Sequence, residues 1–175
     1  SEVEDVERRV RKLLEENDRL LEENEKSARE LMKRDKKVSD ENEKSVRDLL
    51  DRLRKEIRDE DVVRKVEEIL KDLLRKDREV SKENIKILKE LLDRSRDSSR
   101  RVRETLKRLL DKARKDKDVL EELLKKLRKL SEDNERLLRE SNERAKRSTD
   151  ESERLSRETN ERVKDVVTRL KEASK

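Results

Sequence analysis

Apolar residues recur every three or four positions along almost the whole chain, which is the spacing of one face of an α-helix. From Val3 to Ile57 the stripe advances by about 3.6 residues per turn, the value of a straight α-helix. The stripe breaks at only two places, Arg58–Asp61 and Lys115–Asp118. The chain contains no Gly and no Pro, so the runs between the breaks hold no helix-breaking residue. The pattern therefore predicts three long, nearly straight helices.

We expect helices over about 2–58, 61–114 and 118–173, each of about 55 residues, with turns near 58–61 and 115–118. Turns this short make neighbouring helices antiparallel, so the first and third helices run parallel. The predicted fold is all-α, a coiled-coil-like antiparallel three-helix bundle that forms a single domain over residues 1–175. One continuous helix is the alternative, because neither break contains Gly.

Acidic residues stand at both breaks, where they can cap the helix that follows. Asp59 or Asp61 can accept a hydrogen bond from the free N–H groups at the start of the second helix. Asp118 and Glu121 have the spacing of a capping box at the start of the third. Weak cation binding by the acidic run at 59–61 is the alternative, and capping is the better explanation.

The composition is extreme: 58% of the residues are charged and 28% are hydrophobic. Such values are typical of disorder, but disorder does not explain a sustained helical period or the absence of Gly and Pro. The 53 basic and 48 acidic residues are interleaved and leave a net charge of +5. Without a basic block or an aromatic residue for base stacking, we expect no nucleic-acid partner.

The usual catalytic and metal-binding residue types are missing. The chain has no His and no Cys, which excludes Ser-His-Asp and Cys-His sites, and no Gly for a phosphate-binding loop. We therefore expect no enzyme, no cofactor and no metal. No apolar run reaches the ~20 residues needed to span a bilayer, and the acidic start lacks the core of a signal peptide. These features are consistent with a soluble protein and cytoplasmic recombinant expression, and they leave the natural compartment unknown.

Polar residues occupy many positions on the apolar stripe itself. Two segments repeat this pattern 117 residues apart, so that Asn17 aligns with Asn134 and Asn24 aligns with Ser141. A buried amide or hydroxyl costs free energy unless it is hydrogen-bonded, so repeated burial implies planned partners. The predicted structural polar core is Asn17, Asn24, Ser39, Asn42, Ser81, Asn84, Ser95, Ser98, Asn134, Ser141, Ser152, Ser156 and Thr159.

Folding the chain at the two turns gathers these residues into four layers. Residue i of the first helix lies near about 119 minus i on the second, and the second and third helices pair near about 233 minus i. The expected layers, placed to about one turn, are Asn17 with Ser131, Asn134 and the region of Ser99 and Val102; Asn24 with Ser95, Ser98 and Ser141; Asp35 with Ser81, Asn84 and Ser152; and Ser39 and Asn42 with Asp77, Ser156 and Thr159. We expect hydrogen-bond networks that fix register, with the five asparagines pointing at other helices. A seam wetted by solvent is the alternative.

Asp35 and Asp77 are the residues of the stripe whose burial would cost the most free energy, because a buried carboxylate needs several donors. We expect both to lie at its edge and reach water. The alternative is burial, for which Arg34, Lys36 or Ser152 could serve Asp35, and Asn42 or Ser156 could serve Asp77. Stability must then come from two apolar clusters, one of Leu13/Leu14, Leu106/Leu109/Leu110 and Leu127/Leu130, the other of Leu49/Leu50/Leu53, Ile69/Leu70/Leu73 and Val163/Val166/Val167.

Taken together, the near-equal helices, the missing residue types, the dense Glu/Lys/Arg surface and the polar layers resemble computationally designed helical bundles with buried hydrogen-bond networks. This resemblance implies a monomeric structural scaffold that has no natural substrate and requires no partner. The alternative function is a helix-pairing or binding module, one component of a designed homo- or hetero-oligomeric assembly with a helical partner chain. Spectrin-like repeats are the nearest natural comparison, but their aromatic core residues are absent here.

Overall fold

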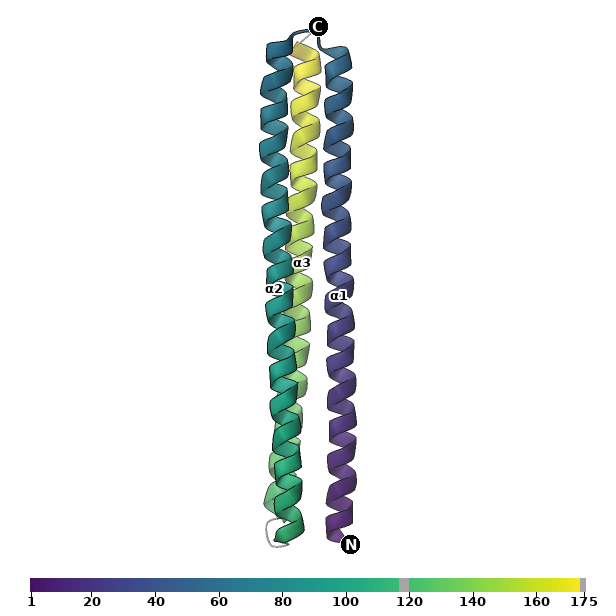
Figure 1. The fold of residues 1–175 in the computed structure, drawn as a ribbon, viewed down its shortest axis with the longest axis vertical. Helices are drawn as coiled ribbons and strands as arrows, with labels where there is room; N and C mark the ends of the chain where they lie inside the picture. Colours follow the sequence, from purple (N-terminus) through teal and green to yellow (C-terminus); the bar gives the residue numbers. More distant parts are fainter. Residues whose placement is uncertain (117–119, 174–175) are drawn as a thin grey trace. The chain divides into compact units, whose positions relative to one another are not determined.

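The protein consists of three long α-helices, as predicted (Figure 1). The computed structural model describes residues 1–116 and 120–173. Helix α1 spans Glu2–Glu56, α2 spans Glu60–Lys115 and α3 spans Leu120–Ala173. The expected bounds differ from these by one or two residues. The alternative of a continuous helix is wrong, because three non-helical residues, 57–59, separate α1 from α2.

The turn between α1 and α2 is held at both ends. Ile57 is buried, and its N–H donates to Leu53 O at 2.8 Å, which closes the last turn of α1. Asp59 Oδ1 accepts from the N–H of Asp61 at 3.0 Å, so Asp59 is the N-cap of α2, as one of the two predicted alternatives had it. The capping box expected of Asp118 and Glu121 lies outside the residues whose side chains are described.

The chain forms two compact units, and each helix contributes a segment to both. Unit 1 comprises Ser1–Arg29 and Leu88–Ala145, and unit 2 comprises Glu30–Ile87 and Lys146–Lys175. Inside each unit α1 and α3 run parallel: Asn17 contacts Asn134 in unit 1 and Asp35 contacts Ser152 in unit 2, both 117 positions apart. The α2 segment is antiparallel to both. That residues 1–175 fold as one domain stays a prediction.

Unit 1 has an apolar core in which leucine and valine of all three helices meet. Leu106 and Leu127 are fully enclosed, and each buried leucine contributes about 1.5–3 kcal/mol relative to an exposed one. The buried members are Val6, Val10, Val102, Leu106, Leu109, Ala113, Leu123 and Leu127, with Leu13, Leu14, Leu110, Leu124 and Leu130 packed against them. The leucine cluster predicted here is therefore confirmed.

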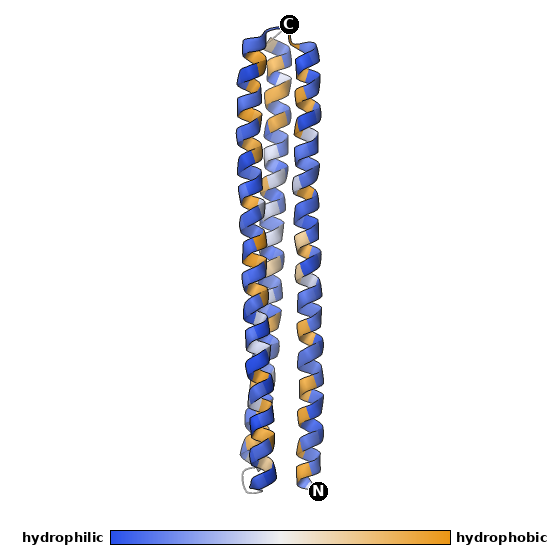
Figure 2. Cartoon of the chain, in the orientation of Figure 1, coloured by the Kyte–Doolittle hydropathy of each residue, from blue (hydrophilic) through white to orange (hydrophobic). Residues whose placement is uncertain are grey.

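Unit 2 has a second core of the same kind. Its buried members are Val46, Leu50, Leu53, Ile57, Val66, Leu70, Leu74, Val163 and Val167, with Leu49, Val62, Val63, Leu73 and Leu170 packed against them. Ile69 and Val166 were also expected in this cluster, and neither belongs to it. The side chain of Ile69 is 48% exposed, and Val166 is half-buried between Val163 and Val167. Ile69 precedes the fully buried Leu70, and adjacent helical residues point about 100° apart. Figure 2 shows hydrophobic residues as isolated bands on otherwise hydrophilic helices.

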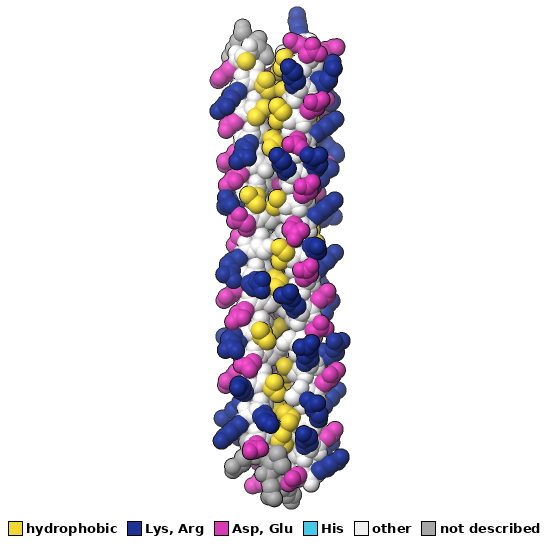
Figure 3. Space-filling view, turned by 90° about the vertical axis from the view of Figure 1, so that its left-hand side faces the viewer, with side chains coloured by type: hydrophobic (Ala, Val, Ile, Leu, Met, Phe, Trp, Pro, Cys, Tyr) yellow, Lys and Arg dark blue, Asp and Glu magenta, His cyan; other side chains and the backbone are white. Residues whose placement is uncertain are grey.

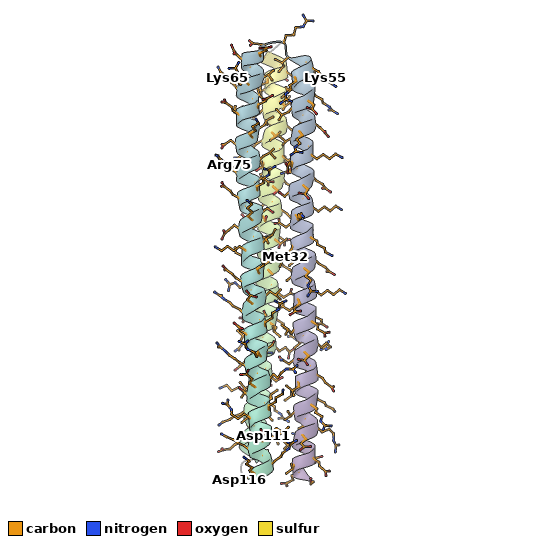
Figure 4. All side chains as sticks on the ribbon, in the orientation of Figure 1. Met32, Lys55, Lys65, Arg75, Asp111 and Asp116 are labelled. Atoms are coloured by element: carbon orange, nitrogen blue, oxygen red, sulfur yellow. The ribbon has the colours of Figure 1, made fainter. Side chains whose placement is uncertain are left out.

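The outer faces of the helices carry the charged residues. Lys55 of α1 and Lys65 and Arg75 of α2 point away from the neighbouring helices (Figure 4). Many pairs join residues three or four apart on one helix, such as Arg19 with Glu23 at 3.2 Å. Each exposed pair of this kind contributes only about 0.3–0.5 kcal/mol, so these pairs do not decide the fold.

Candidate functional site

The first polar layer of unit 1 links all three helices through Asn17. Its Nδ2 donates to the carbonyl of Ser99 on α2 over 3.4 Å, and its Oδ1 accepts from Asn134 Nδ2 on α3. Ser98 on α2 donates to Asn134 Oδ1 at 3.0 Å, which joins α2 to α3. Both asparagines are buried, so each amide has exchanged water for partners on other helices.

The second layer of unit 1 is centred on Ser95 of α2. Asn24 of α1 donates to Ser95 Oγ at 2.8 Å, and Ser141 Oγ of α3 lies 3.1 Å from the same oxygen. Ser95 can donate its single proton to the carbonyl of Leu91, 2.9 Å away on its own helix. The hydroxyl is therefore satisfied even without a side chain on α1.

Asp35 is the centre of the first layer of unit 2. Its Oδ2 accepts from Ser81 of α2 at 2.9 Å, and its Oδ1 accepts from Ser152 of α3 at 2.7 Å. The residue is 1% exposed, so the expectation that it reaches water is wrong. Two serine hydroxyls replace that water, one from each neighbouring helix. Among the described residues no basic side chain forms an ion pair with Asp35.

Asp77 repeats this arrangement from α2. It is 3% exposed, which again contradicts the expected edge position. Ser39 of α1 donates to Oδ2 at 3.4 Å, and Ser156 of α3 donates to Oδ1. Asn42 of α1 adds a bond of 2.6 Å to the carbonyl of Ser156. The two aspartates thus have the same environment, a carboxylate between serines of the other two helices.

Two further contacts join pairs of helices. Asn84 of α2 donates to Thr149 Oγ1 at 3.3 Å and accepts from Ser148 at 2.6 Å, both on α3. Ser27 of α1 donates to Asn142 Oδ1 on α3 at 2.7 Å. Asn84 was grouped with Asp35 and Ser98 with Asn24, whereas the structure bonds Asn84 to 148–149 and Ser98 to Asn134. The differences are about one turn, the precision of an alignment by counting.

Nine residues of the predicted polar core are buried: Asn17, Asn24, Asn42, Ser81, Asn84, Ser95, Asn134, Ser152 and Ser156. Four are only half-buried: Ser39, Ser98, Ser141 and Thr159. Thr159 joins no layer through its hydroxyl, which donates to Leu155 O of its own helix at 3.0 Å. Such back-bonding is a common fate of Thr inside a helix. Ser131 is half-buried and also lies outside the bonds of the first layer.

Sequence reasoning missed several members of these contacts. Thr149 is fully buried and Glu153 is 8% exposed. Arg34 of α1 reaches Glu153 with Nε at 2.5 Å and Asp150 with Nη2 at 2.9 Å. The hydrogen bond with Glu153 raises the pKa of Arg34, against the opposing effect of burial. The signal was present, because Thr149, Ser152, Glu153 and Ser156 have three- and four-residue spacing, but the dense surrounding charge masked it.

Two buried polar atoms have no hydrogen-bond partner among the described residues. They are Ser99 Oγ in unit 1 and Asn160 Oδ1 in unit 2. An unsatisfied buried group costs about 1–3 kcal/mol. The layers are therefore well satisfied with two local defects.

The layers join the helices by hydrogen bonds, and four of their residues also line a groove in unit 1: Ser95, Ser98, Asn134 and Ser141. Within residues 1–116 and 120–173 no cluster of three metal-ligating side chains occurs, and no helix is both long and apolar enough to cross a membrane. Comparison of the chain with protein-family models, with curated proteins and with solved structures finds no match in any of the three. The polar layers and the surface of the protein are therefore the features that bear on its function.

Proposed function

We propose that this chain is a computationally designed structural scaffold without a natural substrate, and that its Asn, Ser, Thr and Asp layers set the register and topology of its helices. The observation that supports this most directly is the pair of aspartate layers. Asp35 on α1 and Asp77 on α2 each bond serines of both other helices. An apolar core at these positions would tolerate several helix registers. These hydrogen bonds, in contrast, form in only one register.

The polar layers raise the free energy of packings in which the helices are out of their native register. Sliding one helix by a turn separates Asp35 from Ser81 or Ser152, and the buried carboxylate then loses one of its two hydroxyl donors. Each buried group left unpaired costs about 1–3 kcal/mol, so slipping past four layers costs far more than the native state loses by holding them. The leucine and valine clusters supply the stability, and the polar layers supply the uniqueness.

The test is to remove the layers and measure register. In one variant Asn17, Asn24, Asp35, Asn42, Asp77 and Asn134 are all replaced by Leu. Because the chain has no Cys, spin labels can be attached at Lys33→Cys and Lys65→Cys, two exposed positions in unit 2. Electron–electron resonance then reports the distance between α1 and α2. A slip of one turn moves the labels by about 5 Å along the helix axis.

We expect one narrow distance in the parent and a broad or multiple distribution in the leucine variant, which should remain helical and at least as resistant to denaturant. Restoring Asp35 and Asp77 alone, which lie in the labelled unit and bond serines across α1 and α2, should recover much of the parent distribution and is the matched control. A leucine variant with the same single distance as the parent would refute the register function.

A further inference from the structure

A groove of about 540 Å³ lies between α2 and α3 in unit 1. Its floor contains Val102 from α2 and Leu130, Leu137 and Leu138 from α3. Leu137 is 50% exposed, and it and Ile69 are the large apolar side chains that the described residues leave exposed. Figure 3 shows hydrophobic side chains exposed on one face, flanked by charged side chains. We call the groove lined by these α2 and α3 residues the α2–α3 groove.

The rim of the α2–α3 groove is mainly basic on α2 and mainly acidic on α3. Arg94 and Arg101 stand seven residues apart on α2 with Asp97 between them, and Asp133 and Glu140 stand seven residues apart on α3, where Arg144 also lines the groove. Asp133 pairs with Arg136 of its own helix at 3.2 Å. The antiparallel contacts Ser95–Ser141 and Ser98–Asn134 place Arg94 at the level of Glu140 and Arg101 at the level of Asp133. The two rims would attract each other if they were closer.

No ion pair closes this groove. Among the described residues, ion pairs join α1 to α2 and α1 to α3, but none joins α2 to α3. On the other flank of α2, Arg96 and Arg103 also stand seven residues apart, and they pair with Glu25 and Asp18 of α1. Arg94 and Arg101 have the same spacing toward the groove, and no ion pair joins either of them to an acidic side chain in the described part of the chain.

The spacing of these charges specifies the occupant. Seven residues of α-helix span about 10.5 Å and return to the same face. An extended strand covers that distance in about three residues, an odd number that turns the second side chain away. A second folded copy is a poor fit, because outside the groove the described residues expose only Ile69 as a large apolar side chain, which is too little apolar surface to fill it.

We propose that the α2–α3 groove of unit 1 binds an amphipathic helix of a separate partner chain. This helix packs an apolar stripe against Leu137 and Leu130. It carries acidic residues seven apart facing Arg94 and Arg101, and basic residues seven apart facing Asp133 and Glu140. Such flanking charges select partner and orientation in helical assemblies. The inference goes beyond the register function and does not depend on it.

The probes are three synthetic helices of about four heptads, each with Leu at the two core positions and one Trp on the outer face. One has Glu on one flank and Lys on the other, the second has Lys on both flanks, and the third has Glu on both. The chain has no aromatic residue, so Trp fluorescence anisotropy reports the peptide alone. We expect the mixed-charge peptide to bind about tenfold tighter than either of the others.

Two double variants at the rim should change this preference in a defined direction. R94E together with R101E makes both rims acidic, and the peptide with Lys on both flanks should then bind best. D133K together with E140K makes both rims basic, and the peptide with Glu on both flanks should bind best. This exchange of preference is a result that general stickiness or a loss of folding does not produce. Circular dichroism verifies that each variant is helical.

Leu137→Glu should weaken binding of the mixed-charge peptide about tenfold or more, because it places a charge under the apolar stripe. Ile69→Glu is the matched control, since it alters a similarly exposed apolar side chain in unit 2 and should leave binding unchanged. Equal binding of the three peptides, equal effects of the two substitutions, or no measurable binding would overturn the proposal. So would a parent chain that is dimeric by light scattering and becomes monomeric with Leu137→Glu, because a second copy would then occupy the groove.

Discussion

Ser152 of α3 donates a 2.7 Å hydrogen bond to Asp35 of α1, and this contact helps to bury a carboxylate that has no cationic partner among the described residues. Hydroxyl donors compensate only part of the cost of removing a charge from water. We therefore expect Asp35→Asn, which keeps the shape and removes the charge, to raise the free energy of unfolding at neutral pH by about 1–2 kcal/mol. Denaturant titration followed by far-ultraviolet circular dichroism measures this.

Asp40→Asn is the matched control, because Asp40 lies on the same helix and is exposed. Its replacement should change stability by no more than about 0.5 kcal/mol. Asp77→Asn should behave like Asp35→Asn, since its two serine donors have the same arrangement. A loss of stability in both buried variants would show that the hydrogen bonds outweigh the cost of burying the charge.

Ser99 is a place where the sequence is locally suboptimal. Its hydroxyl is buried and lacks a partner within the described part of the chain, although its carbonyl accepts from Asn17. Ser99→Ala removes the orphaned group, keeps the carbonyl and improves helix propensity, so it should stabilise the protein by about 1 kcal/mol in thermal or denaturant unfolding. Ser95→Ala, at a hydroxyl that contacts Asn24 and Ser141, should instead lower stability. Equal effects of the two substitutions would contradict this account.

Asn24 and Asn17 should respond differently to replacement by Leu. Asn24→Leu leaves Ser95 with its acceptor, the carbonyl of Leu91, and adds buried apolar surface, so stability should equal or exceed that of the parent. Asn17→Leu removes the acceptor of buried Asn134 and should cost about 1–3 kcal/mol. Denaturant titration of the two variants tests the contrast, and a clear loss with Asn24→Leu would count against it.

The sequence predicts the helices and the location of the layers because both depend on spacing. The two breaks in the stripe place the helix ends within two residues, and the offset of 117 places Asn17 against Asn134 and Asp35 against Ser152. The burial of the aspartates could not be predicted in this way. Whether Asp35 faces water depends on the rotation of α1 and on two hydroxyls from distant segments, which spacing does not specify. Spacing also does not specify that the hydroxyl of Ser98, and not that of Ser99, donates to Asn134, because this depends on the direction of each side chain.

Arg34 and Glu153 form an ion pair that the residue spacing did not reveal. Replacing only Arg34 should lower stability more than replacing both partners. Arg34→Met leaves the nearly buried Glu153 carboxylate with only Arg157 at 3.9 Å, so we expect a loss of about 1–2 kcal/mol. Adding Glu153→Gln to that variant should recover most of the loss, because a neutral amide is cheaper to bury. Thermal unfolding of the two single variants and the double variant forms the cycle. Additive losses would show that the two side chains are not coupled.

Glu67 of α2 provides a pH-dependent test of the contact between α1 and α2. Arg54 of α1 donates to Glu67 Oε1 at 2.6 Å, and this hydrogen bond lowers the pKa of Glu67 below its ordinary value of 4.5, against the opposing effect of desolvation. Because the folded state holds the charged form, the stabilisation is fully present above pH 4.5 and is lost as the pH falls through the lowered pKa. Carboxyl NMR should show Glu67 titrating at lower pH than it does in the Arg54→Met variant. An unchanged midpoint in that variant would mean that Arg54 does not stabilise the charged form of Glu67 in solution.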